Sequence, residues 1–133
     1  MSNRHLKDRE LIKSKALPAA DATSYTDGID LGQETLGPDG DRMEAEIAIP
    51  ATPNLAATKT ITARLQDSAD NETFEDIAAL GALTVTGGAA GGAASSQAFR
   101  LPRTTRRYIR ASFTVAADGG TNTAVSGTLS LLF

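Results

Sequence analysis

Hydrophobic and polar side chains alternate along most of the chain from residue 27 onward. Within 43–49 the odd-numbered side chains are apolar and Glu44 and Glu46 stand between them, until Pro50 ends the run. A period of two is the spacing of a β-strand that buries one face. The same spacing predicts further strands at 61–65, 74–78, 83–85, 97–101, 107–115 and 125–133, with 29–31 as a candidate eighth.

Polar and glycine-rich stretches separate these strands. Residues 67–72 are predicted to form a polar turn, and 118–122, Asp-Gly-Gly-Thr-Asn, is predicted to close a hairpin. No long helix interrupts the series, so a parallel α/β sheet is not expected. Roughly eight short antiparallel strands at this spacing predict an all-β fold, a sandwich of the jelly-roll or immunoglobulin-like kind.

The first 24 residues do not follow this alternation. A short helix could form in HLKDRELIKSKAL, but Pro18 would end it and its apolar positions make only a ragged stripe. We therefore expect an extended or partly helical N-terminal arm over 1–24 and a β-sandwich domain over 25–133.

The large apolar side chains available for a core are few. Leu, Ile, Val and Phe number 27 among 133 residues, a share near the lower limit for a folded domain. Phe113 shares one face of its predicted strand with Ile109, Ala111 and Val115, so we expect it at the centre of the core. Because a small core gives little stability to an isolated subunit, we expect a symmetric oligomer.

Charge is segregated along the sequence. Residues 1–20 carry a net charge of +3, residues 21–90 carry −10, and residues 91–133 carry +4. Such segregation can steer contacts between copies or with a charged partner, although solvated surfaces also carry charge. The residues that we predict to bind a partner are Arg4, Lys7, Arg9, Leu11, Ile12, Arg103, Arg106 and Arg107.

Catalytic and metal-binding patterns are weak. The sequence has no Cys, and His5 lies in the predicted arm without a framework to hold it. A catalytic triad needs a fixed His, and zinc needs three or four nitrogen or sulfur ligands. Two acidic turns, at 39–41 and 67–72, could offer oxygen ligands to calcium, but neither has EF-hand spacing. We expect no enzymatic activity, no metal and no cofactor.

Nucleic acid and membranes are not expected partners. Five arginines lie between 100 and 110, but the sequence pI is about 5.1 and few aromatic residues are interleaved with them. No apolar run approaches the roughly 18 residues that a membrane-spanning helix needs. The N-terminus is charged and lacks the apolar region of a secretory signal, so we expect the protein to be made in the cytoplasm.

One low-complexity segment, 86–96, contains almost only Gly, Ala and Ser. Such a segment has few side chains to pack and much backbone freedom, which favours a flexible loop. The alternative is a loop that lies close against another subunit, since small residues permit close backbone approach.

The order of segments resembles a known family. Two segments come first, Asp8-Arg-Glu-Leu-Ile-Lys-Ser-Lys-Ala-Leu-Pro-Ala-Ala and then Ala22-Thr-Ser-Tyr-Thr-Asp-Gly-Ile-Asp-Leu-Gly. The middle segment is Ile61-Thr-Ala-Arg-Leu-Gln-Asp-Ser, with Phe74 after it. The last two are Arg107-Tyr-Ile-Arg-Ala-Ser-Phe-Thr-Val and the closing Thr123-Ala-Val-Ser-Gly-Thr-Leu-Ser-Leu-Leu-Phe. This order is similar to that of jelly-roll capsid cement (decoration) proteins of tailed bacteriophages.

The resemblance covers residues 8–133, except that the stretch 86–96 has no counterpart in the family pattern. It implies a jelly-roll fold and a homotrimer at three-fold positions on the capsid exterior, where it would clamp neighbouring major capsid subunits. The alternatives are another virion subunit, such as a tail or head-fibre protein, and a carbohydrate-binding jelly-roll module. Tyr25 and Tyr108 are the two tyrosines and there is no Trp, which disfavours a sugar site.

Overall fold

The computed structural model describes residues 12–35 and 43–132. This part of the chain contains strands and no helix, which confirms the all-β prediction. The strands are β1 (Ile12–Ala16), β2 (Ala22–Tyr25), β3 (Ile29–Thr35), β4 (Glu44–Ile49), β5 (Thr60–Ser68), β6 (Glu75–Asp76), β7 (Leu83–Thr86), β8 (Ser95–Arg100), β9 (Arg106–Val115) and β10 (Ser126–Leu132).

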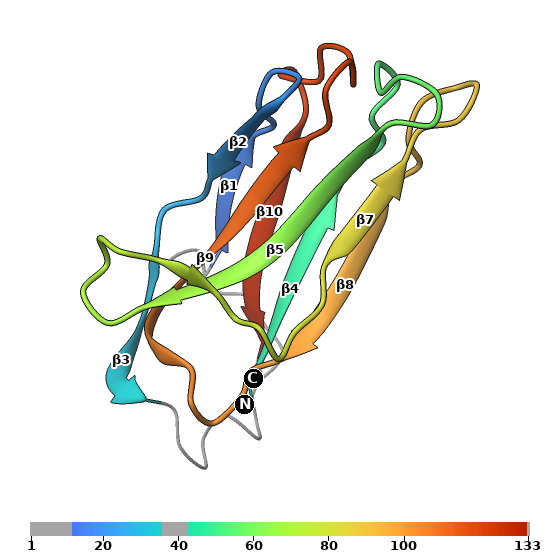
Figure 1. Cartoon of the computed structure of the whole chain (residues 1–133). Coiled ribbons are helices and arrows are strands. Elements are labelled where there is room, and N and C mark those ends of the chain that lie inside the picture. Colours follow the sequence, from blue (N-terminus) through green and yellow to red (C-terminus); the bar gives the residue numbers. More distant parts are fainter. Residues whose placement is uncertain (1–11, 36–42, 133) are drawn as a thin grey trace.

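The strands form two antiparallel sheets that pack face to face as a jelly-roll-like sandwich (Figure 1). One sheet has the order β1-β10-β4-β8. The other has the order β2-β9-β5-β6, with β3 also paired to β9 and β7 also paired to β5. The chain changes sheet at six of its connections, so strands that are adjacent in the sequence often lie in opposite layers. We refer to the two layers as the four-stranded and the six-stranded sheet.

The core lies between the layers and follows the period-two pattern. Ile109, Ala111, Phe113 and Val115 of β9 all have zero exposure, as their shared face predicts. Phe113 reaches across to the opposite sheet, where a Cβ on Gly127 of β10 would stand 2.5 Å from its ring. The missing side chain at that position therefore gives the largest core residue its space.

The predicted N-terminal arm differs from the structure. Residues 12–16 and 22–25, all within the predicted 1–24 arm except Tyr25, are strands β1 and β2, paired with β10 and β9 respectively. Leu17 between them is buried, with 1% exposure. These strands are short and lie at sheet edges, where the lysines of β1 obscure the alternation. Residues 1–11 lie outside the described residues.

The predicted hairpin at 118–122 is wrong. The strands on either side of it, β9 and β10, lie in different sheets, so this segment crosses between layers. Asp118 and Gly120 adopt positive φ angles of 60° and 87° within it. The turn-forming residues were recognised correctly, but local turn chemistry does not determine which sheet the next strand joins.

The Gly/Ala segment packs against its own chain. The backbones of Thr52 and Gly92 bond to each other in both directions at 2.9 Å, and Gly87 N–H donates to the Lys59 carbonyl at 2.8 Å. A Cβ at Gly92 would collide with the Thr52 hydroxyl. Small residues thus permit close backbone approach, and within the described residues the approach is intramolecular.

Phe113→Ala should lower the free energy of unfolding by about 3–5 kcal/mol, because it empties the centre of the sandwich. Denaturant unfolding measures the change. Thr114→Ala, one position along the same strand but on its exposed face, is the matched control and should change stability far less. Equal stability of the Phe113 variant and the wild type would contradict the assigned register.

Candidate interaction surface

The predicted partner-binding residues do not all come together. Arg4, Lys7, Arg9 and Leu11 lie outside the described residues. Ile12 begins β1 and is half-buried opposite Ser130, at the edge of the four-stranded sheet. Arg103 lies in the exposed turn between β8 and β9, and Arg106 and Arg107 begin β9. The structure therefore places Ile12 and the two β9 arginines in different sheets.

The most organised group of surface side chains surrounds β9 of the six-stranded sheet. Because β9 pairs with β2, β3 and β5, side chains from all three meet its outward-facing residues. The register places Gln66 opposite Arg110 and Tyr25 opposite Ser112. The arginines of β9 provide the charged groups of this surface.

Arg106 joins β9 to the β5–β6 hairpin. Its backbone N–H donates to the Asp67 carboxylate at 3.0 Å, and its guanidinium donates to the same carboxylate at 2.8 Å. A further bond of 3.1 Å reaches Glu75, which is much more exposed. The hydrogen bond to Asp67 is the main cause that raises the pKa of Arg106. This guanidinium is thus neutralised by its own chain.

Arg107 joins β9 to β3 through a two-point contact. Its guanidinium donates to the two carboxylate oxygens of Asp30 at 2.8 and 3.0 Å, and the Gly32 N–H donates to Asp30 at 2.8 Å. These bonds, first that from Arg107, lower the pKa of Asp30. Both side chains of the ion pair are more than 40% exposed, so salt will weaken it.

Arg110 is held differently. Its guanidinium lies over the rings of Tyr25 and Phe74, with ring-centre distances of 3.9 and 4.0 Å, and its Nε–H donates to Gln66 at 2.8 Å. Gln66 in turn donates to Asp76 at 2.9 Å. We call this group, Arg110 with Tyr25, Phe74 and Gln66, the arginine clamp. Arg110 is one of the five arginines between 100 and 110 but was not among the predicted partner-binding residues.

One member of the clamp could be placed from the sequence. Arg110 alternates with the apolar residues Ile109, Ala111 and Phe113, so its place on the outward face of the strand was predictable. Its ring partners were not, because Tyr25 and Phe74 are 85 and 36 residues away along the chain. Burial is the first cause that lowers the pKa of Arg110, which agrees with its position between the rings.

In the acidic turn at 67–72, which was considered for calcium, the Asp70 carboxylate accepts hydrogen bonds from the turn itself. The backbone N–H groups of Thr73 and Glu72 donate to the Asp70 carboxylate at 2.9 Å, and the Ser68 hydroxyl donates to it at 2.8 Å. These bonds, that from Thr73 first, lower the pKa of Asp70 to about 2. Within 12–35 and 43–132 no cluster of three potential metal-ligating residues occurs. The turn at 39–41 lies outside the described residues.

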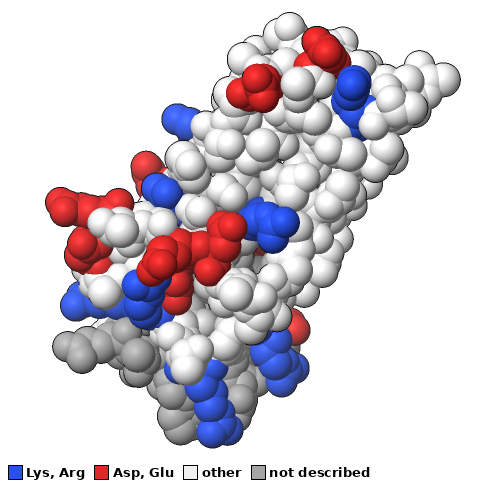
Figure 2. Space-filling view, viewed as in Figure 1, with Lys and Arg blue, Asp and Glu red and all other residues white. Residues whose placement is uncertain are grey.

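Charge is unevenly distributed over this face. Figure 2 shows charged side chains gathered near β3 and the β5–β6 turn, whereas much of the surface toward β7 carries none. Nearer the opposite end of β9, a row of threonines crosses the sheet from β2 to β7, namely Thr23, Thr114, Thr62 and Thr84. Thr23 and Thr114 share a hydrogen bond of 2.9 Å. The face therefore has a charged end and a hydroxyl-rich end.

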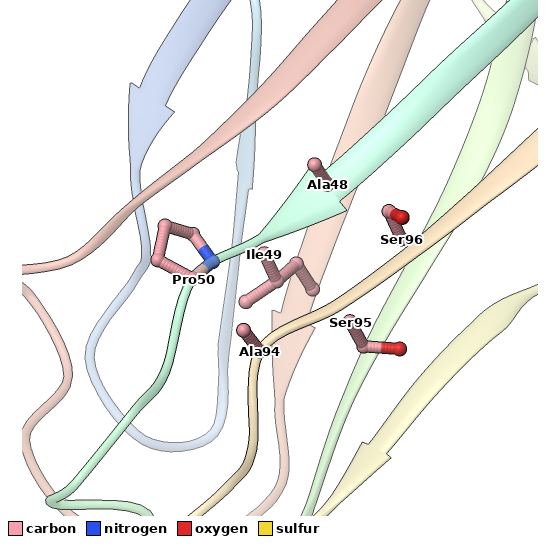
Figure 3. Close-up of a pocket in the computed structure, with 6 residues that line it drawn as sticks. All are labelled: Ala48, Ile49, Pro50, Ala94, Ser95 and Ser96. Carbon is pink, nitrogen blue, oxygen red and sulfur yellow. The ribbon is translucent and has the colours of Figure 1, made fainter.

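A shallow hollow of about 300 Å³ lies where β4 ends and β8 begins (Figure 3). Its lining consists of small or apolar side chains, namely Ala48, Ile49, Pro50, Ala94, Ser95 and Ser96. It contains no titratable group, so it offers space for an apolar side chain rather than acid–base chemistry. No helix in the described part of the chain is long and apolar enough to cross a membrane.

A model of the family described as Bbp16 matches residues 12–131. No curated protein matches the sequence. Among solved structures, PBSX exported protein XepA has a TM-score of 0.56 and 16% identity over 89% of this chain. The match covers 34% of XepA, so this chain spans about a third of that protein's length.

Two other solved structures have lower scores. A tailspike protein domain of bacteriophage CBA120 has a TM-score of 0.45 and 10% identity, covering 89% of this chain and 15% of the other. A family 4 carbohydrate-binding module has a TM-score of 0.41 and 12% identity, covering 88% and 74%. Of these three structures, XepA alone exceeds 0.5, and at its sequence identity the likeness concerns the fold.

The carboxyl carbon of Asp70, followed by NMR, should titrate with a midpoint of about 2. This pKa lies below 3.8, the ordinary value for an Asp carboxyl. The hydrogen bonds to the ionised Asp70 therefore stabilise the fold fully above pH 3.8, and this contribution is lost as the pH falls through about 2. Ser68→Ala removes one of the donors and should raise the midpoint. A midpoint near 3.8 in the wild type would contradict the described hydrogen bonds.

Proposed function

This chain belongs to the Bbp16 family, and from that premise we propose that it is a non-enzymatic structural protein of a bacteriophage particle. It decorates the outer surface of the capsid and stabilises it by clamping neighbouring major capsid subunits. The motif order that resembles capsid cement proteins supports this proposal. The fold shared with the PBSX exported protein XepA is compatible with it.

The observation that carries the proposal is the fixed network of surface side chains around β9. Arg106, Arg107 and Arg110 are each held by groups from other strands, at distances of 2.8–3.1 Å for the polar contacts. Side chains that are already ordered lose less conformational entropy when a partner binds. Such preorganisation favours a protein that binds other proteins through a rigid surface.

The presence of distinct surfaces on the two sheets also favours a large partner. The charged end (Figure 2) and the threonine row belong to the six-stranded sheet, and the hollow lined by Ala48 and Pro50 lies at the other sheet. A decoration protein that contacts two neighbouring capsid subunits needs more than one contact surface. The two sheets of the sandwich provide surfaces of different chemistry for this purpose.

Heads assembled without this chain should take it up in proportion to the major capsid protein when the purified protein is added. Quantitative electrophoresis of sedimented heads measures the ratio, and the decorated heads should resist heating better than bare heads. A reconstruction should show three copies around three-fold positions, as the resemblance implies. Uptake of only a few copies per particle would favour a tail or fibre component and contradict the proposal.

Residues 1–11 should strengthen attachment, because they include Arg4, Lys7 and Arg9 and precede the strand that completes the four-stranded sheet. Deleting them leaves β1 intact, so the variant should keep the wild-type unfolding temperature. Its binding to heads should weaken and become less sensitive to salt. The triple substitution of the three cations by Gln is the matched control and should reproduce the salt effect. Wild-type affinity after the deletion would show that these residues are passive.

A further inference from the structure

The three arginines of β9 differ in how their charge is balanced. Arg106 and Arg107 each bond to a carboxylate of their own chain at 2.8 Å. Arg110 forms no such pair within residues 12–35 and 43–132, where its polar partner is the neutral side chain of Gln66. The cation is nevertheless partly buried against two rings. The ring faces compensate part of the cost of burying this charge, and no carboxylate of the described residues compensates the rest.

The clamp fixes the direction of the remaining donors. A guanidinium carries five N–H donors in one plane, and the hydrogen bond to Gln66 uses the one on Nε. Tyr25 and Phe74 contact the group at ring-centre distances of 3.9 and 4.0 Å. The terminal nitrogens are therefore held in place with donors that the described residues leave unused. A carboxylate binds this fork through two parallel hydrogen bonds.

We propose that Arg110 is an anchor for a carboxylate of a protein partner, an Asp or Glu side chain on the surface to which this protein attaches. This inference rests on the proposed function for the identity of the partner. Arg and Tyr are the residue types that most often dominate protein interfaces, and Tyr25 is 41% exposed beside the guanidinium. The rings would shield the new ion pair from water and strengthen it.

Protein is favoured over the other classes of partner. Polyanions such as nucleic acid would be repelled by the acidic residues of the neighbouring β5–β6 hairpin, among them Glu75 and Asp76. A sugar would need a free aromatic face, whereas the guanidinium of Arg110 already covers one face of Tyr25. A single carboxylate needs only the donor edge that the clamp presents.

Arg64 is a matched control on the same face. It lies on β5 opposite Ser112, two residues before Gln66, and its side chain is exposed. Replacing Arg64 by Gln changes the net charge of the face as much as replacing Arg110 by Gln does. A comparison of the two variants therefore separates the clamp from general electrostatics.

The test measures the affinity of the full chain for heads assembled without it, by co-sedimentation. Arg110→Gln should weaken binding by about 30-fold, the scale of an interface hot spot. Arg110→Lys should also weaken it clearly, because an ammonium keeps the charge but cannot form the two-point contact. Arg64→Gln should change the affinity less than about twofold, as expected for an exposed charge.

Thermal unfolding of each variant distinguishes a structural role from a binding role. If Arg110→Lys loses stability but binds heads as the wild type does, the clamp only fastens Phe74 to β9 and the inference is overturned. Equal losses of affinity in the Arg64 and Arg110 variants would also overturn it. Failure of the wild-type chain itself to bind heads would instead contradict the proposed function.

A second measurement tests the carboxylate directly and does not need heads. A short end-capped peptide with one Glu among glycines, which carries a single carboxylate, is titrated into the ¹⁵N-labelled chain at constant ionic strength while the arginine Nε–H resonances are followed by NMR. The Arg110 resonance should shift and saturate, and that of Arg64 should not. Parallel unsaturable shifts of both would overturn the inference. Saturable shifts of Arg110 with neutral xylohexaose but not with the peptide would assign the clamp to sugar binding instead.

Discussion

The structure depends on the two faces of a single strand. β9 pairs with β2, β3 and β5, and its inward residues Ile109, Ala111, Phe113 and Val115 are completely buried. Because neighbouring residues on a strand point to opposite faces, burying one set fixes the positions of the other. The rigid core therefore holds Arg110 opposite Gln66, and Ser112 opposite Tyr25, on the outward face. The arrangement of side chains on the candidate interaction surface is a direct consequence of core packing.

Small residues make this sandwich possible with few large apolar side chains. Gly127 makes room for the ring of Phe113, and Gly92 lets its backbone pair with that of Thr52. Close approach of backbones supplies hydrogen bonds where large side chains are lacking. The low apolar fraction that indicated dependence on other subunits is thus partly offset by close packing within the chain. The predicted trimer stays a prediction for the experiments on decorated heads.

The oppositely charged segments of the sequence form ion pairs with each other within the chain. Asp30, Asp67 and Glu75 belong to the acidic middle segment, and the arginines that bind them belong to the basic C-terminal segment. The antiparallel pairing of β9 with β3 and β5 brings the two segments together. What the sequence analysis interpreted as steering between molecules is therefore in part complementarity between strands. Among the arginines of β9, Arg110 is the one that pairs with no carboxylate of residues 12–35 and 43–132, and the proposed contact depends on it.

The sequence alone determined the local features of this protein. Alternation along the chain identified strands that correspond to β3 through β10, and it placed Phe113 on the buried face of β9. These features depend on neighbouring residues, which is why a period of two reveals them. The edge strands β1 and β2 were assigned to an arm because Lys13, Lys15 and Pro18 interrupt the pattern there.

Tertiary structure decided everything that depends on distant pairing. The residues at 118–122 have the composition of a hairpin, yet β10 joins the opposite sheet because its apolar face completes the core from the other side. The clamp likewise unites Tyr25, Phe74 and Arg110 from separate segments. Their meeting is set by the register of three strands and one turn, and no local pattern encodes that register.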